Sequence, residues 1–487
     1  MSLPPLTPST PSAQGVDANA VHDLLDALET AEAVEPHSLM IVRHGRLVAS
    51  GWWAPYTPDR LHLLYSLSKS FTSTAVGLAV AEGLVDLDAP VLSYFPELDA
   101  EITDPRSRAM LVRHAAAMAS GHEEEDTVDR AYALDPGNLV RAFLLLPPDR
   151  DPGTVFAYNQ CATYALGAIV RRVTGQSLTA YLRPRLFDPL GIGEVAWLTD
   201  PPGAELGFSG LHGTTDTIAR LGLLYLDEGV WDGERVLPRE WVAEATREHI
   251  PTSDQPADTD RLDWERGYGF QFWQSRHGYR GDGAYGQFCL VLPEYDAVVA
   301  ATAAAGDMQA VLTFVWELLL PGFRSAPLSG GEEADTALAE RLSRLALPPA
   351  PGKPAPSERA GEWQRAVFTP YGGACAAQPG LTGASVAADG DGDGDGWTLT
   401  LVEDGRELAL PLGFGGWNVT EEPLPTAVSG GWTDGDTLAV DVAFLETPHR
   451  LRVSCSLADH TFTARWATAP LHGGPLRTQC APRGSGG

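Results

Sequence analysis

A serine and a lysine stand three positions apart in the stretch 65–83, and together they could act as a nucleophile and its base. Apolar residues cover most of this stretch, which predicts a buried helix that ends at Gly83. Ser66 and Lys69 then share one helical face. A serine hydroxyl becomes a good nucleophile when a neighbour takes its proton. A lysine can take that proton only if burial and the positive end of the helix lower its pKa well below about 10.4.

Lysine is almost absent from the rest of the chain. Of its 34 basic residues two are lysines, Lys69 and Lys353, and Lys353 lies in a proline-rich stretch. Arginine keeps its proton near neutral pH, whereas a buried lysine can lose it. Retaining a lysine at position 69 therefore indicates a need for a titratable amine. The alternative is a lysine that only caps the helix or extends from it.

Composition narrows the class of protein. The length of 487 residues predicts two or three domains, and no apolar run is long enough to cross a membrane. The net charge of −30 argues against nucleic acid and anionic membrane as partners. The N-terminal residues lack the features of a secretion signal. Five scattered cysteines show no metal spacing: Cys161, Cys289, Cys375, Cys455 and Cys480. Together these features predict a reduced, cytoplasmic protein without a metal site.

The order of elements predicts an α/β (α+β) fold for residues 21–321. Residues 38–53 are typical of a β-hairpin, the aromatic stretch 264–292 of antiparallel strands, and residues 311–320 of a closing helix. Helices are predicted between them at 110–118, 139–146, 161–173, 178–186, 216–227 and 238–246. We expect an antiparallel sheet flanked by helices, with a separate α-helical subdomain.

The composition changes after this region. Residues 322–361 are rich in proline and predict a linker, and residues 362–467 contain short strands between Gly/Asp turns. That pattern predicts a small all-β domain, a barrel or a sandwich. Residues 1–20 and 468–487 are predicted to be loose tails. The Asp/Gly run at 389–396 lacks the glutamate that a calcium loop needs at its twelfth position, so we interpret it as an acidic hairpin turn.

Further candidate residues follow the serine–lysine pair. Tyr158 comes just before a predicted helix, where its phenol either packs structurally or points its hydroxyl into a cleft. A glycine-rich strand at 281–283 follows later in the chain. The acidic loop 122–126 has no partners at ligand spacing, so we interpret it as a solvated loop rather than a metal site.

These motifs, in this order, resemble those of the penicillin-binding-protein/β-lactamase-like serine hydrolases, on the class C, esterase and D-aminopeptidase side of that family. The resemblance covers residues 38–321. It rests on four segments: 65–72, 152–160, 184–192 and 283–287. The β domain at 362–467 is similar to the lipocalin-like C-terminal domains that some members carry.

The resemblance implies that Ser66 attacks a carbonyl and forms an acyl-enzyme. Lys69 and Tyr158 would share the proton, which Tyr158 passes to the leaving group before it helps to activate water. The oxyanion hole would be the backbone N–H groups of Ser66 and Ala284. The implied substrate-binding residues are Gln160, Gly281, Asp282 and Gly283. No metal or organic cofactor is implied, and the implied partner is a small ester or amide, or an acyl or peptide substrate.

Two positions depart from the family pattern. Gln160 stands where asparagine or serine is usual, although its longer amide can still bind a substrate. The third motif lacks the usual lysine or histidine, the cation that binds a carboxylate in penicillins and peptides, unless Arg280 or His277 replaces it. We therefore predict an intracellular hydrolase of uncharged or differently anchored esters or amides, and neither efficient β-lactam hydrolysis nor a cell-wall role.

Two other functions stay open. A thioesterase or peptide cyclase would pass a carrier-bound acyl chain from Ser66 to an amine, the chain arriving on a carrier protein. The β domain could supply a cation to that site from Arg450, Arg452 or Arg465. A catalytically silent binding or sensor module is the other alternative, which the retained serine, lysine and tyrosine argue against. Three tryptophans either line a substrate pocket or pack in the core: Trp197, Trp264 and Trp273.

Overall fold

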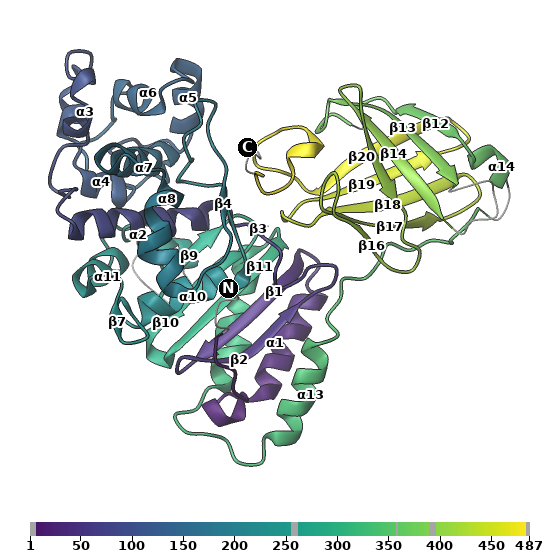
Figure 1. Ribbon diagram of the computed structural model, residues 1–487, viewed down its shortest axis with the longest axis horizontal. Coiled ribbons are helices and arrows are strands. Elements are labelled where there is room, and N and C mark those ends of the chain that lie inside the picture. The colour runs from purple at the N-terminus through teal and green to yellow at the C-terminus, as the bar shows by residue number, and fades with distance from the viewer. Residues whose placement is uncertain (1–5, 255–261, 357–358, 374, 389–395, 484–487) are drawn as a thin grey trace. The chain divides into compact units, whose positions relative to one another are not determined.

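The computed structural model describes residues 6–254, 262–356, 359–373, 375–388 and 396–483. The predicted acidic turn of the Asp/Gly run therefore falls outside the described residues. The chain forms two compact units (Figure 1). The first comprises Met1–Gly51 and Leu64–Ser343, and the second comprises Trp52–Leu63 and Arg344–Gly484. No sequence pattern predicts that the short segment Trp52–Leu63, just before Ser66, belongs to the second unit.

A six-stranded sheet forms the centre of the first unit, in the order β2-β1-β11-β10-β9-β8. Its strands are β2 (Arg46–Trp52), β1 (Val34–Arg43), β11 (Ala297–Ala305), β10 (Gln287–Leu292), β9 (Tyr279–Gly283) and β8 (Trp273–Gln274). The predicted hairpin is confirmed as β1 and β2, which turn at His44 and Gly45 with φ of 50° and 67°. Positive φ at both central residues suits a tight hairpin turn.

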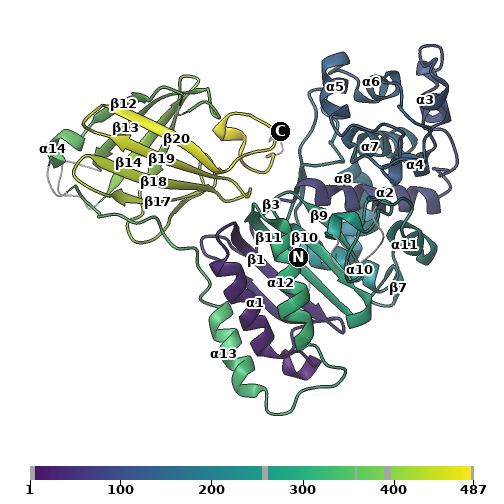
Figure 2. The same cartoon turned by 180° about the vertical axis from the view of Figure 1, so that it is seen from behind.

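Helices cover both faces of this sheet. Helices α1 (Ala18–Thr30), α12 (Met308–Phe314) and α13 (Glu332–Leu342) lie together on one face, where α1 packs on β1 (Figure 2). Helix α10 (Thr215–Leu226) packs against β10 and β11. Gly222 allows this approach, because a Cβ there would lie 2.6 Å from Val298. The sheet is thus closed off from solvent by apolar helix faces.

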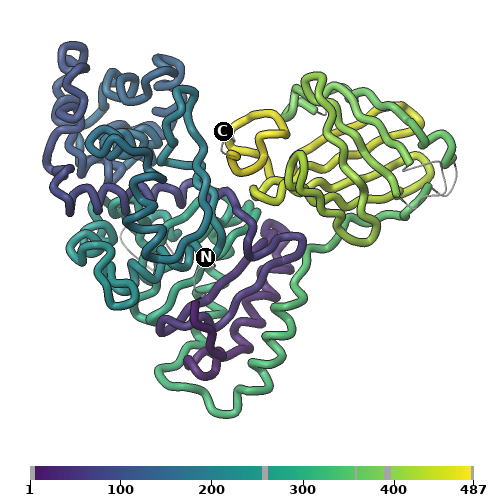
Figure 3. Tube along the Cα trace, in the orientation of Figure 1, coloured from purple at the N-terminus to yellow at the C-terminus, as the bar shows by residue number. Residues whose placement is uncertain are grey.

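A helical layer makes up the rest of the first unit, and its winding is easiest to follow along the chain trace (Figure 3). Its helices are α2 (Ser68–Ala81), α3 (Pro105–Ala109), α4 (Val112–Ala116), α5 (Thr127–Leu134), α6 (Leu139–Leu145), α7 (Gln160–Thr174), α8 (Leu178–Leu182), α9 (Asp188–Leu190) and α11 (Arg239–Thr246). Helix α7 contacts α2, α4, α5, α6 and α8. Two short strand pairs complete the unit: β4 (Ala196–Trp197) with β5 (Leu211–Gly213), and β6 (Val230–Trp231) with β7 (Glu234–Arg235).

The aromatic stretch 264–274 differs from its prediction. Only β8 at its end is a strand, and Tyr268 makes isolated bridges to Ile250 and Trp273. Gln271 has a φ of 65°, a left-handed conformation that breaks an extended run. Alternating aromatic residues therefore mark a folded-back loop here.

The second unit contains a nine-stranded sheet that closes almost completely into a barrel. In sheet order its strands are β15 (Arg406–Pro411), β14 (Trp397–Glu403), β13 (Leu381–Ala388), β12 (Ala366–Pro370), β20 (Thr461–Thr468), β19 (Arg450–Ser456), β18 (Thr437–Phe444), β17 (Thr426–Trp432) and β16 (Asn418–Thr420). The unit also contains β3 (His62–Leu63) and α14 (Ala360–Trp363). Trp432 lies in its core, with ring centroids of Trp363 and Trp397 at 5.6 and 4.8 Å. The predicted all-β fold is confirmed, and its likeness to lipocalins stays a prediction.

Two absences hold for the part of the chain that the structure describes. None of its helices combines the length and apolar character needed to cross a membrane. It also contains no group of three or more His, Cys, Asp or Glu side chains arranged to hold a metal ion.

Gly283 at the end of β9 supports the first prediction. A Cβ at this position would lie 2.1 Å from the Leu64 carbonyl oxygen, so the strand and the turn before Ser66 would have to separate. We expect Gly283→Ala to lower the free energy of unfolding by about 1–3 kcal/mol, measured by urea denaturation. Gly306→Ala is the control, because the nearest atom to its Cβ is the Ala33 carbonyl oxygen at 3.7 Å. Equal stabilities of the two variants would contradict the prediction.

Candidate active site

Ser66 lies in a single 3-10 turn, Tyr65–Leu67, that leads directly into α2. Tyr65 has a φ of 48°, a left-handed conformation that is costly for an aromatic residue and persists only under tertiary packing. Tyr285 has a φ of 67° and meets the Tyr65 ring edge-on, at 5.7 Å between centroids. Since Tyr285 follows Ala284, a strained residue stands beside each of the two predicted oxyanion-hole residues.

Strand β9 packs closely against the turn that carries Ser66. A Cβ on Gly281 would lie 2.5 Å from both Leu67 Cδ1 and Ser70 Oγ, and one on Gly283 would reach the Leu64 carbonyl. Only residues without a side chain allow this approach. The two glycines of the third motif thus have a packing role that brings the end of β9 beside the serine.

Lys69 is buried next to Ser66. Its Nζ lies 3.0 Å from Ser66 Oγ, donates to the Phe208 carbonyl oxygen at 2.8 Å, and stands 4.6 Å from the centroid of the Tyr158 ring. Burial lowers the pKa of Lys69 well below 10.5, and the Asp282 carboxylate opposes that shift. A neutral amine in this position donates to Phe208 and accepts the proton of Ser66. The environment therefore favours the base form of this lysine.

Tyr158 faces the same pair from the loop before α7. Its ring stacks on Trp273 at 5.4 Å between centroids and 21° between planes. Burial raises the pKa of Tyr158, the Asp282 charge raises it further, and a hydrogen-bonding interaction with Ser66 lowers it. The phenol therefore keeps its proton at neutral pH. Burial favours the neutral form of the amine and the protonated form of the phenol. The pKa values of the two groups are thus shifted in the directions that a base and an acid need.

Asp282 occupies the middle of the third motif, and its carboxylate is paired. It is 7% exposed, accepts a hydrogen bond from Arg280 Nε at 2.9 Å, and accepts another from the Trp264 indole. The same guanidinium donates through Nη1 to the Gln274 carbonyl and the Ser275 hydroxyl, each at 2.8 Å. Arg280 is thus held by Asp282 and by the end of β8.

His277 is the second residue that could replace the cation missing from the third motif, and aromatic packing holds it in place. The His277 ring contacts Tyr295 and Trp316 at 5.8 and 5.3 Å between centroids. Gln160, at the start of α7, has a buried Oε1 that no hydrogen-bond donor reaches among the described residues. A buried acceptor of this kind is suited to a substrate N–H group.

Several residues around Ser66 and Lys69 carry no clear signal in the sequence. Tyr268 is fully buried and interacts through its hydroxyl with Tyr158, and burial raises the pKa of Tyr268 well above 10. Its aromatic, glycine-flanked position is the available signal, and that pattern predicts a strand where the structure has a loop. The carbonyl of Phe208 carries no sequence signal, since every residue has one. Of the three tryptophans, Trp273 and Trp264 reach this site, while Trp197 donates to the Ser209 carbonyl at 2.7 Å.

The prediction of a solvated loop at 122–126 is wrong for its first residue. His122 is 1% exposed and hydrogen-bonded on both ring nitrogens, so it is part of the interior rather than of a solvated loop.

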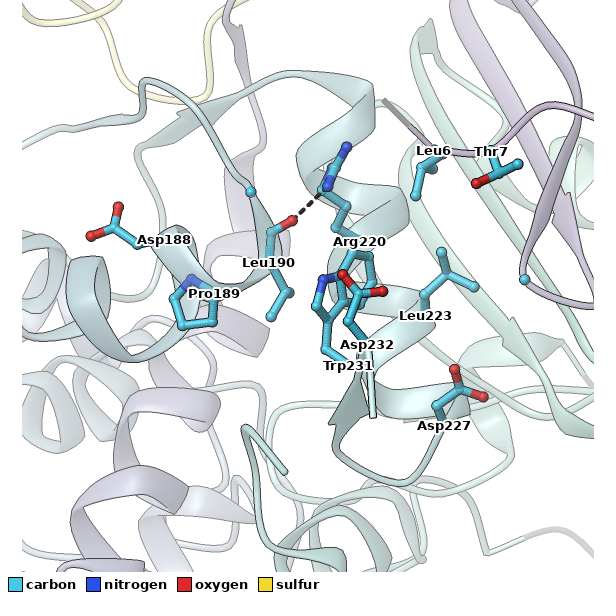
Figure 4. A pocket seen from close by; sticks show the side chains of 12 residues that line it. Leu6, Thr7, Asp188, Pro189, Leu190, Arg220, Leu223, Asp227, Trp231 and Asp232 are labelled. Atoms are coloured by element: carbon cyan, nitrogen blue, oxygen red, sulfur yellow. Dashed lines mark hydrogen bonds between the residues drawn. The ribbon is translucent and has the colours of Figure 1, made fainter. Parts of the chain in front are cut away.

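A hollow of about 340 Å³ lies elsewhere in the first unit, between α9, α10 and the β6–β7 turn (Figure 4). Arg220 crosses it and donates to the Leu190 carbonyl at 2.5 Å, while Trp231, Asp227 and Asp232 line its wall. Neither Ser66 nor Lys69 borders this hollow, so the candidate chemistry lies outside it.

The fold is that of the β-lactamase-like serine hydrolases. Residues 22–317 match the Beta-lactamase family, and the chain belongs to it. The chain is 29% identical over 325 residues to 6-aminohexanoate-dimer hydrolase of Paenarthrobacter ureafaciens, covering 62% of this chain and 81% of that protein. It is 28% identical over 337 residues to penicillin-binding protein 4 of Amycolatopsis lactamdurans, covering 61% and 87%. The chain is therefore a serine hydrolase.

A solved structure shows the same fold. EstCE1, described as a hydrolase with promiscuous acyltransferase activity, has a TM-score of 0.50 to this chain at 16% sequence identity. The match covers 61% of this chain and 98% of EstCE1.

Asp282 supports a prediction on pH dependence. If Lys69 must be neutral to accept the Ser66 proton, activity falls as the pH drops through the pKa of Lys69. Because Asp282 raises that pKa, Asp282→Asn lowers it, and the acidic limb of the kcat/KM profile moves to lower pH. Asp227→Asn, at an exposed carboxylate that borders the separate hollow, is the control and leaves the limb in place.

Breaking a buried ion pair costs about 3–5 kcal/mol, so circular dichroism must first show that D282N is folded. A limb that stays in place or moves to higher pH in the folded variant would contradict the prediction.

Proposed function

We propose that this chain hydrolyses an ester or amide through an acyl-enzyme on Ser66, with Lys69 as the base and Tyr158 as the acid. One observation carries the proposal: Nζ of Lys69 lies 3.0 Å from Oγ of Ser66, where burial lowers the pKa of the amine. A serine beside a neutral amine is a nucleophile ready to lose its proton.

The acylation step follows from these roles. Oγ of Ser66 attacks the carbonyl carbon while its proton passes to Lys69, and the carbonyl oxygen takes the electron pair. The N–H groups of Ser66 and Ala284 stabilise that oxyanion. As the intermediate collapses, the bond to the leaving group breaks and Tyr158 protonates that group. Lys69 then returns the serine's proton to the phenolate.

Deacylation uses the same groups. Water attacks the acyl carbon and gives a proton to neutral Lys69, and the bond to Oγ breaks as Ser66 regains a proton. The acid product leaves with the water oxygen, and the enzyme returns to its starting state. An amine in place of water would give the aminolysis or cyclisation product through the same acyl-enzyme.

The charge of the site supports a substrate class. The charge of Arg280 is neutralised by Asp282, and its Nε and Nη1 are engaged by Asp282 and by the end of β8, while its Nη2 is buried without a hydrogen-bond partner among the described residues. The third motif therefore carries no net positive charge to attract a carboxylate on the substrate. Gln160 offers a buried acceptor for an N–H group. We therefore propose substrates that lack a carboxylate beside the scissile bond, which disfavours penicillins. The relative named for the 6-aminohexanoate dimer supports testing that dimer.

The acyl-enzyme gives the decisive experiment. With p-nitrophenyl butyrate we expect a burst of p-nitrophenolate, and with a fluorophosphonate probe a single added mass on the intact protein. Ser66→Ala abolishes both signals, whereas Ser70→Ala, a neighbouring helix serine bonded to the Gln271 carbonyl, keeps the mass increase. Repeating the assay with a primary amine separates hydrolysis from acyl transfer. An unmodified wild-type protein under both reagents would refute the proposal and favour a silent binding module.

The role of Tyr158 as the acid can be tested by comparing two substrates with different leaving groups. A p-nitrophenolate leaves without help, whereas an amide nitrogen must be protonated, and general acid catalysis contributes about 10²–10⁴-fold. We expect Tyr158→Phe to reduce kcat for the 6-aminohexanoate dimer at least ten times more than the acylation rate by p-nitrophenyl butyrate. Equal losses on both substrates would show that Tyr158 does not act as the acid.

A further inference from the structure

A row of hydrogen bonds runs behind Tyr158 to a buried histidine. Asn159 Nδ2 donates to Ser120 Oγ at 3.2 Å, Ser120 Oγ lies 3.0 Å from His122 Nδ1, and His122 Nε2 lies 3.0 Å from the Leu146 carbonyl oxygen. The three side chains are each at most 1% exposed. No step of the reaction proposed above uses any of them.

The direction of every bond in this row follows from its last member. A carbonyl only accepts, so His122 Nε2 must carry a proton, and the neutral ring then offers Nδ1 as an acceptor. The Ser120 hydroxyl therefore donates to Nδ1, which leaves its oxygen free to accept from Asn159. The Asn159 amide can then take only one orientation, with its Oδ1 turned away from Ser120.

That orientation secures the segment that carries Tyr158 and Gln160. Asn159 Oδ1 accepts the Cys161 N–H at 2.9 Å and the Ala162 N–H at 3.4 Å, which caps α7. The Asn159 backbone N–H donates to Met118 Sδ at 3.3 Å. Asn159 is the residue between the proposed acid and the substrate-binding amide, so its position fixes both.

We propose that His122 is a positioning residue for the reaction of Ser66: its neutral imidazole holds Ser120 and Asn159, and so holds the Tyr158 hydroxyl and the Gln160 amide in place. This inference rests on the proposed function. A proton on Nδ1 would reverse the bond to Ser120, whose own hydrogen would then lose its acceptor. The row therefore works only with a neutral ring.

The surroundings of His122 keep the ring neutral. Burial lowers its pKa below 6.5, and the Arg130 charge lowers it further. The bond to the Leu146 carbonyl and the charges of Asp149 and Asp104 act in the opposite direction. The ring also packs on Phe143, at 5.4 Å between centroids.

Two isosteric variants separate positioning from a structural role. Asparagine places its amide where Nδ1 stands, so His122→Asn keeps an acceptor for Ser120 and loses the bond to Leu146. Glutamine reaches the place of Nε2, so His122→Gln keeps that bond and loses the acceptor. We expect H122Q to lower kcat for the 6-aminohexanoate dimer, an amide whose leaving group needs the proton of Tyr158, by about 10- to 100-fold, and H122N to stay within about threefold of wild type.

Thermal unfolding of both variants accompanies the kinetics, and only folded protein is compared. If His122 only anchors the Leu146 carbonyl, the order of activity of the two variants is reversed, and H122N is impaired while H122Q is active. That order, or equal activity of H122Q and wild type, would overturn the proposal.

An NMR measurement keeps the inference testable if the proposed function fails. In protein labelled with ¹⁵N-histidine, the signal that disappears in H122N belongs to His122. We expect that signal to report a neutral ring protonated on Nε2 at pH 7. A ring protonated on Nδ1, or on both nitrogens, would refute the row of bonds whether or not the enzyme acylates. The expected tautomer with no acylation of wild-type protein would refute the proposed function instead.

Discussion

The burial of one amine governs the structure of this site. Lys69 is enclosed by α2, by the Phe208 carbonyl and by the ring of Tyr158, and little water remains to stabilise its charge. An ammonium group in such surroundings is costly, so burial lowers the pKa of Lys69 and favours its neutral form. The helix that carries it is buried over nearly its whole length, and α7 packs along it. The layered fold thus buries this amine beside the Ser66 hydroxyl.

Close packing around the serine requires unusual backbone conformations. Four residues other than glycine have positive φ at or next to segments that form the site: Tyr65, Met118, Gln271 and Tyr285. Each such conformation costs about 1–3 kcal/mol and is retained only where tertiary contacts outweigh it. Tyr65 and Tyr285 hold each other edge-on, while Gln271 donates to the Ala116 carbonyl at 2.7 Å. Contacts from the sheet, from the loop that contains Gln271 and from the helical layer therefore all help to position Ser66.

An ion pair balances the charge in the interior around Ser66. Arg280 and Asp282 neutralise each other on β9, so the glycine-rich strand end beside Ser66 carries a balanced charge. The pair still acts on its surroundings, because Asp282 raises the pKa of both Lys69 and Tyr158. Behind the tyrosine, His122 is satisfied by hydrogen bonds rather than by an ion pair. The same few buried polar groups thus set the charge and the hydrogen bonding around Ser66.

Local sequence patterns were enough to predict the fold class, the hairpin, the all-β unit and the proximity of Ser66 and Lys69. Ser66 and Lys69 lie within one helical turn, so their spacing alone predicted that they meet. His122 was misread as part of a solvated loop, because acidic neighbours dominate its local pattern, whereas its burial comes from Phe143 and Leu146. The interaction of Tyr158 with Tyr268 likewise joins segments far apart in the chain. Spacing reports which residues can meet within a helix or strand, but only tertiary packing decides which groups lose their water. Loss of water sets the pKa values on which this chemistry depends.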